Sequence, residues 1–123
     1  MRIVLDLSPE DVMSANDRPT HWTRAERTRR IRDAAFTAWF WAGRPQFERL
    51  TCVCTVDYPD RRKRDAHNYV ATMKAAIDGM VHPPYVHRGL LPDAGDRYLT
   101  GPDPRSGGVT PGRYRFTFEF EEA

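Results

Sequence analysis

The sequence predicts a single α+β domain, in which one mixed sheet of about four strands carries two main helices on one face. The chain has 123 residues, of which 40% are apolar, so it matches one ordinary domain with one core. Segments near both ends alternate apolar and polar residues, as half-buried strands do. Two segments between them repeat apolar residues every three or four positions, as amphipathic helices do. No internal repeat or low-complexity stretch divides residues 1–123.

Four segments are expected to form the sheet. Residues 2–7 alternate in the period of a strand, and residues 50–58 are rich in the Cys, Thr and Val that suit a sheet interior. Residues 113–121 are the clearest strand, because an aromatic side chain recurs at every second position. A short strand is expected at residues 96–100. The Gly/Pro-rich residues 101–112 are expected to form a loop.

The first helix is expected over residues 23–42, after a loop over residues 8–22. Thr23 and Glu26 fit a capping box at its start, and Gly43 marks its end. The helix dipole favours cations near the C-terminal end, so a cluster of arginines in the first half is unfavourable for the helix itself. Such a cluster indicates binding of an external anion. These arginines are Arg24, Arg27, Arg29, Arg30 and Arg32.

The second helix is expected over residues 68–80, where apolar residues recur with helical spacing. Asp65 or Asn68 would cap its start, and His82-Pro83-Pro84 would end it. If the helix begins by His67, then His67, Lys74 and Asp78 share its polar face.

Composition narrows the classes of function. No stretch approaches the roughly 20 apolar residues of a membrane span, and residues 1–6 lack the longer apolar run of a signal peptide. We therefore expect a cytoplasmic protein without a membrane partner. Cys52 and Cys54, the only cysteines, are separated by one residue on an expected strand, which strains a disulfide and favours two buried thiols.

The formal net charge of +2 hides an asymmetry. Residues 18–64 hold 12 Lys/Arg against 5 Asp/Glu, whereas the rest of the chain holds 7 against 12. A basic half indicates a polyanionic partner such as nucleic acid, although a solvated charged surface would give the same counts.

The most informative segment is the basic run Arg61-Arg62-Lys63-Arg64, which is followed at once by Asp65. Two further acids, Asp93 and Asp96, come later in the chain. Cations bind phosphate, and clustered carboxylates bind Mg²⁺. Together they indicate metal-assisted cleavage of a phosphodiester.

The same residues also fit plain structural roles. Asp65 fits a helix cap, and Lys74 with Asp78 fits an i,i+4 surface pair. Asp93 and Asp96 flank Gly95, as acids in ordinary turns do.

Three segments resemble the RusA family of Holliday junction resolvases: residues 59–68, with the arginine-rich run and Asp65; residues 74–79, which begin at Lys74; and residues 89–93. Asn16-Asp17-Arg18 and the arginine-rich helix also resemble the N-terminal region of that family. The resemblance implies a small α+β fold and an Mg²⁺-dependent homodimeric endonuclease that cuts four-way or branched DNA, encoded by a bacterium or by a phage in a bacterial host.

The resemblance implies roles for individual residues. Asp65 and Asp93 match the essential carboxylates, and Lys74 matches the catalytic lysine. Metal ligands would come from Asp65 and Asp93, with His67 or Asp96 as a third. DNA would be contacted by Asn16, Arg18, Arg24, Arg27, Arg30, Arg61, Arg62, Lys63 and Arg64.

The chain departs from the family pattern at three points. His67 and Pro92 stand where the family has acids, and Lys74 comes three residues later than in the shorter version of the pattern. Imidazole suits Mn²⁺ better than Mg²⁺, so Mn²⁺ is an alternative metal. One alternative function is a branched-DNA-binding dimer that has lost turnover. A second is a small metal-independent RNase that uses His67, His82 or His87 in acid–base roles.

Overall fold

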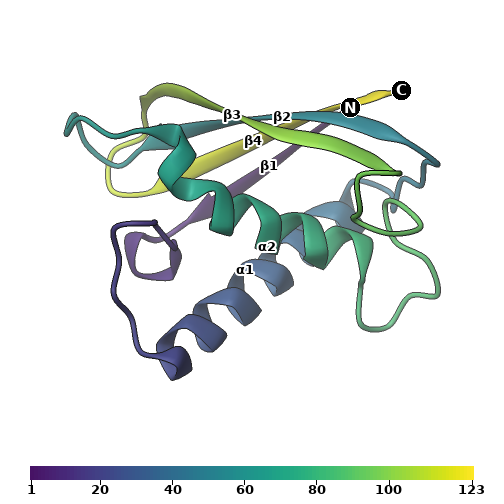
Figure 1. Ribbon diagram of the computed structural model, residues 1–123, viewed down its shortest axis with the longest axis horizontal. Helices are drawn as coiled ribbons and strands as arrows, with labels where there is room; N and C mark the ends of the chain where they lie inside the picture. Colours follow the sequence, from purple (N-terminus) through teal and green to yellow (C-terminus); the bar gives the residue numbers. More distant parts are fainter.

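The computed structural model describes all residues from Met1 to Ala123. One sheet has the strand order β1-β4-β2-β3, in which β4 is antiparallel to both of its neighbours and β2 is parallel to β3. Both long helices lie on the same face of this sheet (Figure 1). The structure therefore confirms the predicted α+β domain with a four-stranded mixed sheet. In chain order the elements are β1 (Arg2–Leu7), η1 (Pro9–Asp11), α1 (His21–Trp41), β2 (Leu50–Tyr58), η2 (Ala66–Tyr69), α2 (Val70–Val81), β3 (Leu99–Val109) and β4 (Tyr114–Glu122).

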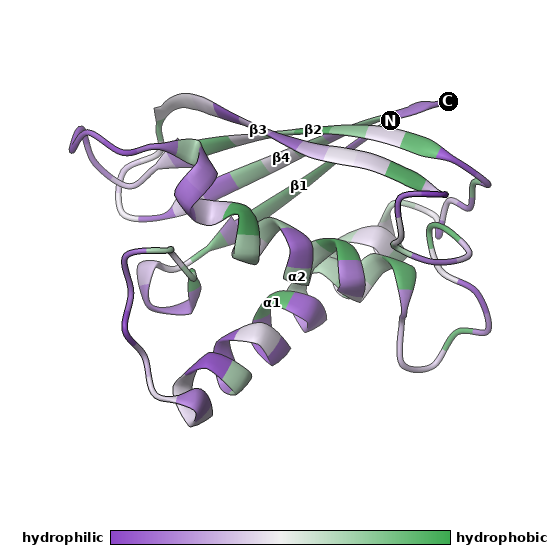
Figure 2. Cartoon of the chain, viewed as in Figure 1, coloured by the Kyte–Doolittle hydropathy of each residue, from purple (hydrophilic) through white to green (hydrophobic).

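The core lies between the sheet and the two helices. Every second residue of β1 and of the first part of β4 is buried, so Phe116, Phe118 and Phe120 point into the core. Trp39 of α1 and Met73 of α2 meet them there, fully buried. Figure 2 shows hydrophobic residues recurring along β1, β2, β4 and α2, whereas the first turns of α1 are mostly hydrophilic. No helix in the structure combines the length and the apolar character that crossing a bilayer requires.

The two cysteines are free and buried, as predicted. Both lie on β2 with their side chains toward the core. Burial raises the pKa of the Cys52 thiol to about 12 and that of Cys54 further. These thiols are therefore protonated packing groups at neutral pH and poor metal ligands.

Helix α1 begins earlier than predicted. Thr20, and not Thr23, is the N-cap, because the Thr20 hydroxyl oxygen accepts a hydrogen bond from the backbone N–H of Thr23 at 3.2 Å. This start places His21 and Trp22 in the first helical turn, where a loop was expected.

Strand β3 is the largest difference from the predicted elements. It spans Leu99–Val109, whereas a strand over residues 96–100 and a loop over residues 101–112 were expected. The glycines and prolines of this segment indicated a loop, but β3 is an edge strand that pairs only with β2. An edge strand tolerates Pro102 and Pro104 because its outer side needs no N–H donor.

The second predicted helix is divided into the 3₁₀ turn η2 and the helix α2. Asp65 caps η2, because its Oδ1 accepts a hydrogen bond from the His67 backbone N–H at 3.0 Å. His67 therefore lies outside α2, and the polar stripe expected to contain it holds only Lys74 and Asp78.

Helices α1 and α2 cross at Gly79. A Cβ atom added at this position would collide with the backbone carbonyl of Arg32. Only a residue without a side chain allows α2 to approach α1 this closely.

We expect Gly79→Ala to destabilise the protein by about 1–3 kcal/mol, the usual cost of overpacking. Alanine favours an isolated helix by about 1 kcal/mol over glycine, so a net loss would show that the contact with Arg32 dominates. Urea unfolding measures the change. Gly95→Ala is the matched control, because its Cβ would make only an ordinary contact with Asp93 Oδ2 at 3.5 Å. A Gly79→Ala variant as stable as the wild type would contradict this packing.

Candidate nucleic-acid-binding site

A hollow of about 500 Å³ lies at the start of α2, and we call it the α2-start hollow. Two segments far apart in the sequence line it, namely the loop that follows β1 and the basic loop that leads into η2. The polar lining residues that matter below are Asn16, Asp17, Arg62, Lys63, Asp65 and Asn68. The structure thus brings together several of the predicted DNA-binding residues and the first predicted metal ligand.

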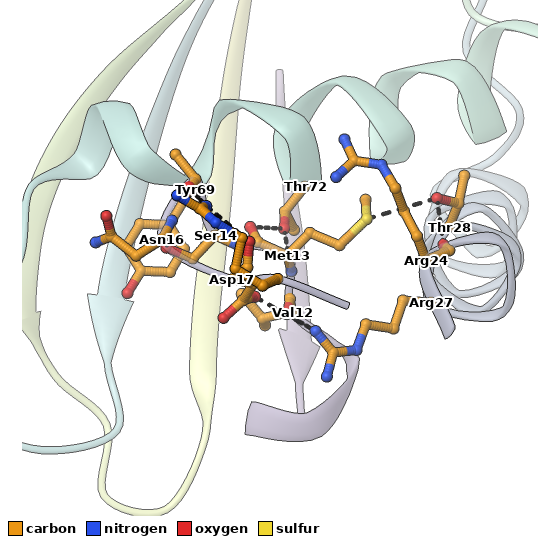
Figure 3. A network of polar contacts seen from close by, with 12 residues as sticks. Val12, Met13, Ser14, Asn16, Asp17, Arg24, Arg27, Thr28, Tyr69 and Thr72 are labelled. Carbon is orange, nitrogen blue, oxygen red and sulfur yellow. Dashed lines mark hydrogen bonds and ion pairs between the residues drawn. The ribbon is translucent and has the colours of Figure 1, made fainter. Parts of the chain in front are cut away.

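The N-terminal loop is held against α2 by buried hydrogen bonds. The Thr72 hydroxyl accepts from the Met13 N–H and donates to the Met13 carbonyl, both at 2.8 Å (Figure 3). Two residues further on, the Ala15 N–H donates to the Asn68 carbonyl at 2.8 Å. Thr72 is 1% exposed and is the one buried polar residue outside the apolar core. These bonds fix Asn16 and Asp17 beside the residues that precede α2.

Arg64 supports the basic loop from within. Its guanidinium donates to Asp60 Oδ1 at 2.6 Å and lies over the rings of Tyr58 and Tyr114 at 5.5 and 5.7 Å. The Arg64 hydrogen bond, followed by that of the Arg62 N–H, lowers the pKa of Asp60 to about 2. The Arg64 side chain is only 11% exposed, so it stabilises the loop and is not available to a ligand. Among the four cations of the run, Arg61, Arg62 and Lys63 carry no ion pair and remain free for phosphate.

Asp65 is an exposed carboxylate with one oxygen engaged. Its Oδ1 accepts from the His67 N–H and lies 3.2 Å from the His67 ring Nδ1, whereas Oδ2 has no partner in the chain. The backbone hydrogen bond from His67, and then the one from its ring, lower the pKa of Asp65. The Asp65 side chain is 68% exposed and that of His67 is 73% exposed. An ionised carboxylate therefore faces solvent at the edge of the hollow.

Asp93 lies at the other end of α2. It follows the end of the helix, and its Oδ1 is 3.4 Å from His82 Nε2. Helix α2 has 12 residues, which corresponds to about 18 Å at the rise of an α-helix. The structure therefore does not bring Asp65 and Asp93 together within one chain, and one chain alone does not supply the ion bridge expected between them.

Lys74 lies between these two ends. It lines a small hollow of about 210 Å³ together with Asp78 and Asp96. The predicted catalytic lysine thus meets Asp96, the predicted alternative ligand, but neither Asp65 nor Asp93 lines this hollow.

The arginines of α1 differ in their partners. Arg27 Nη1 lies 3.3 Å from Asp17 Oδ2, and Arg30 contacts Asp11 at 2.9 Å and Glu26 at 2.7 Å. Of the three arginines predicted to contact DNA from this helix, only Arg24 is free of an ion pair. The Arg18 guanidinium makes only long contacts, to the carbonyls of Ala15 and Asp17.

Sequence reasoning missed Asp17 and Asn68 as members of the site. The signal that could have found Asp17 was its neighbour Asn16, which was assigned to DNA binding from the same short motif. Asp17 is held by the Ser14 N–H at 3.0 Å and by Arg27, and it lines the same hollow as Asp65.

A divalent metal fits this site only in part. Mg²⁺ is commonly held by one or two carboxylates, with water and substrate phosphate oxygens completing its shell. Asp65 and His67 offer two donors side by side, but nowhere in the chain do three His, Cys, Asp or Glu residues lie close enough to hold a metal ion.

No protein-family model matches this chain, and no curated protein matches it. The function is therefore inferred from the residues and geometry of the site.

We expect Thr72→Val to destabilise the protein by about 1–3 kcal/mol, because it leaves the buried N–H and carbonyl of Met13 without partners. The loop that carries Asn16 and Asp17 should also loosen, so the amides of Met13 and Ala15 should exchange with solvent faster. Urea unfolding and hydrogen exchange measure the two effects. Thr100→Val, at an exposed position of β3, is the control. Unchanged exchange at both amides would show that Thr72 does not hold the loop.

Proposed function

We propose that this protein is a metal-dependent, structure-selective DNA endonuclease that acts as a homodimer on branched DNA, such as a four-way junction. The observation that carries the proposal is the α2-start hollow, where the exposed, ionised Asp65 lies beside the free cations Arg62 and Lys63. Such cations hold phosphates in place without reading the base sequence. The carboxylate then lies where a phosphodiester would be held.

Asp65 and His67 would hold the metal from one chain, as Mg²⁺ or, given the imidazole, Mn²⁺. The metal would supply an activated water and stabilise charge on the scissile phosphate. Since α2 separates Asp65 from Asp93, the second carboxylate would come from Asp93 of another copy. A twofold interface is reciprocal, so two copies would complete two sites at once. A four-way junction has near-twofold symmetry and offers two phosphodiesters to such a pair.

A second candidate is a branched-DNA-binding dimer without turnover. The separation of Asp65 from Asp93, and the presence of His67 and Pro92 where the RusA family has acids, favour it. A metal-independent RNase has less support. His67 lies before α2, whereas His82 and His87 line a hollow beyond its end.

The test is Asp65→Asn on a synthetic four-way junction. Asparagine also caps helices, so the variant keeps the local structure and loses only the charge. Loss of an outer-shell partner of a metal costs up to about 100-fold. Because Asp65 would bind the metal directly, we expect cleavage in Mg²⁺ or Mn²⁺ to fall by at least that factor. Junction binding should stay the same or tighten, because a repulsive charge near phosphate is removed.

Asp103→Asn is the control, because Asp103 is an exposed acid on β3 that pairs with Arg105. This variant should cut at the wild-type rate. A chelator should stop cleavage by the wild type and by Asp103→Asn. Normal cutting by Asp65→Asn would rule out this site. A wild type that binds the junction but never cuts would establish the binding dimer, and cutting that survives chelation would establish the RNase.

A further inference from the structure

A large hollow of about 570 Å³ shares no lining residue with the α2-start hollow. It is formed by the first half of α1 and the end of α2, which meet at Gly79. Its lining includes the charged residues Arg24, Arg29, Arg32 and Asp33 and the histidines His21 and His82. None of Arg29, Arg32 and His21 belongs to the proposed cleavage site.

Ion pairing divides the five arginines of α1 into two sets. Arg27 and Arg30 are neutralised by nearby acids, whereas Arg24, Arg29 and Arg32 have no ion pair and all line the large hollow. Figure 3 shows the side chains of Arg24 and Arg27 diverging from α1, with that of Arg27 reaching toward Val12. Arg29 and Arg32 are three residues apart, and like charges at that spacing destabilise a helix. Three unpaired guanidinium groups around one concave surface therefore form a site for an anion with several oxygens, such as phosphate.

Exposed aromatic side chains border this hollow. Trp22 is 75% exposed and, with Ala25, Glu26 and Arg29, lines a second depression that shares Ala25 and Arg29 with the large hollow. Tyr85 is 92% exposed and directly follows the lining residue Pro84. Unpaired arginines beside exposed aromatic rings are the combination that binds single-stranded nucleic acid, through phosphate contacts and base stacking. Duplex DNA has no free base face to offer Trp22.

We propose that this hollow binds an unpaired nucleic-acid strand, with phosphates on Arg24, Arg29 and Arg32 and a base stacked on Trp22. His82 lines the same hollow and contacts Asp93, so the bound strand would run toward that carboxylate. The inference concerns binding alone. It stands whether or not the protein cleaves DNA.

The test measures binding of a fluorescent oligodeoxythymidine of about 10 nucleotides, within the usual site size, by anisotropy without metal. The variant Arg24→Gln/Arg29→Gln/Arg32→Gln should weaken binding and lower the slope of log K against log salt by about 2, at about 0.7 for each phosphate contact. The control is Arg105→Gln/Arg115→Gln on the sheet, at two arginines that line neither hollow. It should keep the wild-type slope, because those arginines are already paired with Asp103 and Asp6.

Trp22 gives an independent readout. Trp22→Ala should weaken binding about 5- to 150-fold, the range for loss of one stacked base, whereas Trp22→Phe should retain most of the affinity. In a Trp41→Phe background the oligonucleotide should quench the fluorescence of Trp22, since Trp39 is buried. Two control ligands are a blunt duplex of the same length and inorganic polyphosphate. Both should bind more weakly than the single strand, and Trp22→Ala should not change their affinity.

Three results would overturn the inference. They are no binding of the oligonucleotide, an equal loss in the two arginine variants, or binding of the duplex or polyphosphate as tight as that of the single strand. A wild type that binds the oligonucleotide but cuts no junction would leave this site standing and remove only the proposed cleavage.

Discussion

The rigid helix α2 is the constraint on which the rest of the structure depends. Its buried residues pack against the sheet, and Gly79 lets it rest directly on the backbone of α1. A helix held on both sides cannot bend to bring its ends together. Asp65 before it and Asp93 after it are therefore kept apart. Asp65 lines the α2-start hollow, whereas Asp93 contacts His82, which lines the larger hollow. A metal centre that uses both acids has to draw them from two chains.

Ion pairs neutralise some of the arginines around α2 and leave others free. Arg64 and Asp60 stabilise the basic loop, and Arg27 and Arg30 tie α1 to the N-terminal loop and to its own first turns. Five cations without an ion pair line two hollows: Arg62 and Lys63 line the α2-start hollow, and Arg24, Arg29 and Arg32 line the larger hollow beside α1. Both hollows suit a polyanion, and their aromatic and acidic neighbours suggest different tasks. One would hold the phosphodiester to be cut, and the other would hold an unpaired strand.

Local pattern was enough to predict most of the fold. The aromatic alternation of β4 and the Cys/Thr/Val run of β2 reflect burial of one face, which a period of two reveals directly. β3 was predicted too short because glycine and proline indicate loops, and only its place at the edge makes a longer strand compatible with them. The start of α1 was misplaced because Thr20 and Thr23 are both good caps, and the choice depends on packing.

In the site, the basic run and Asp65 were predictable as neighbours in sequence. The bond between Met13 and Thr72, the pairing of individual arginines and the separation of Asp65 from Asp93 depend on tertiary structure, and residue spacing does not reveal them.

The most direct test of a shared metal centre mixes two inactive variants, Asp65→Asn and Asp93→Asn. If each site takes Asp65 from one chain and Asp93 from the other, a mixed dimer has one site with both acids intact and one with neither. After subunit exchange, nicking of a four-way junction should therefore recover to about a quarter of the wild-type rate, because about half of all dimers are mixed and each has one of two sites intact. If mixed dimers form but the mixture cuts no faster than either variant alone, the two acids do not meet across a dimer, and the account is wrong.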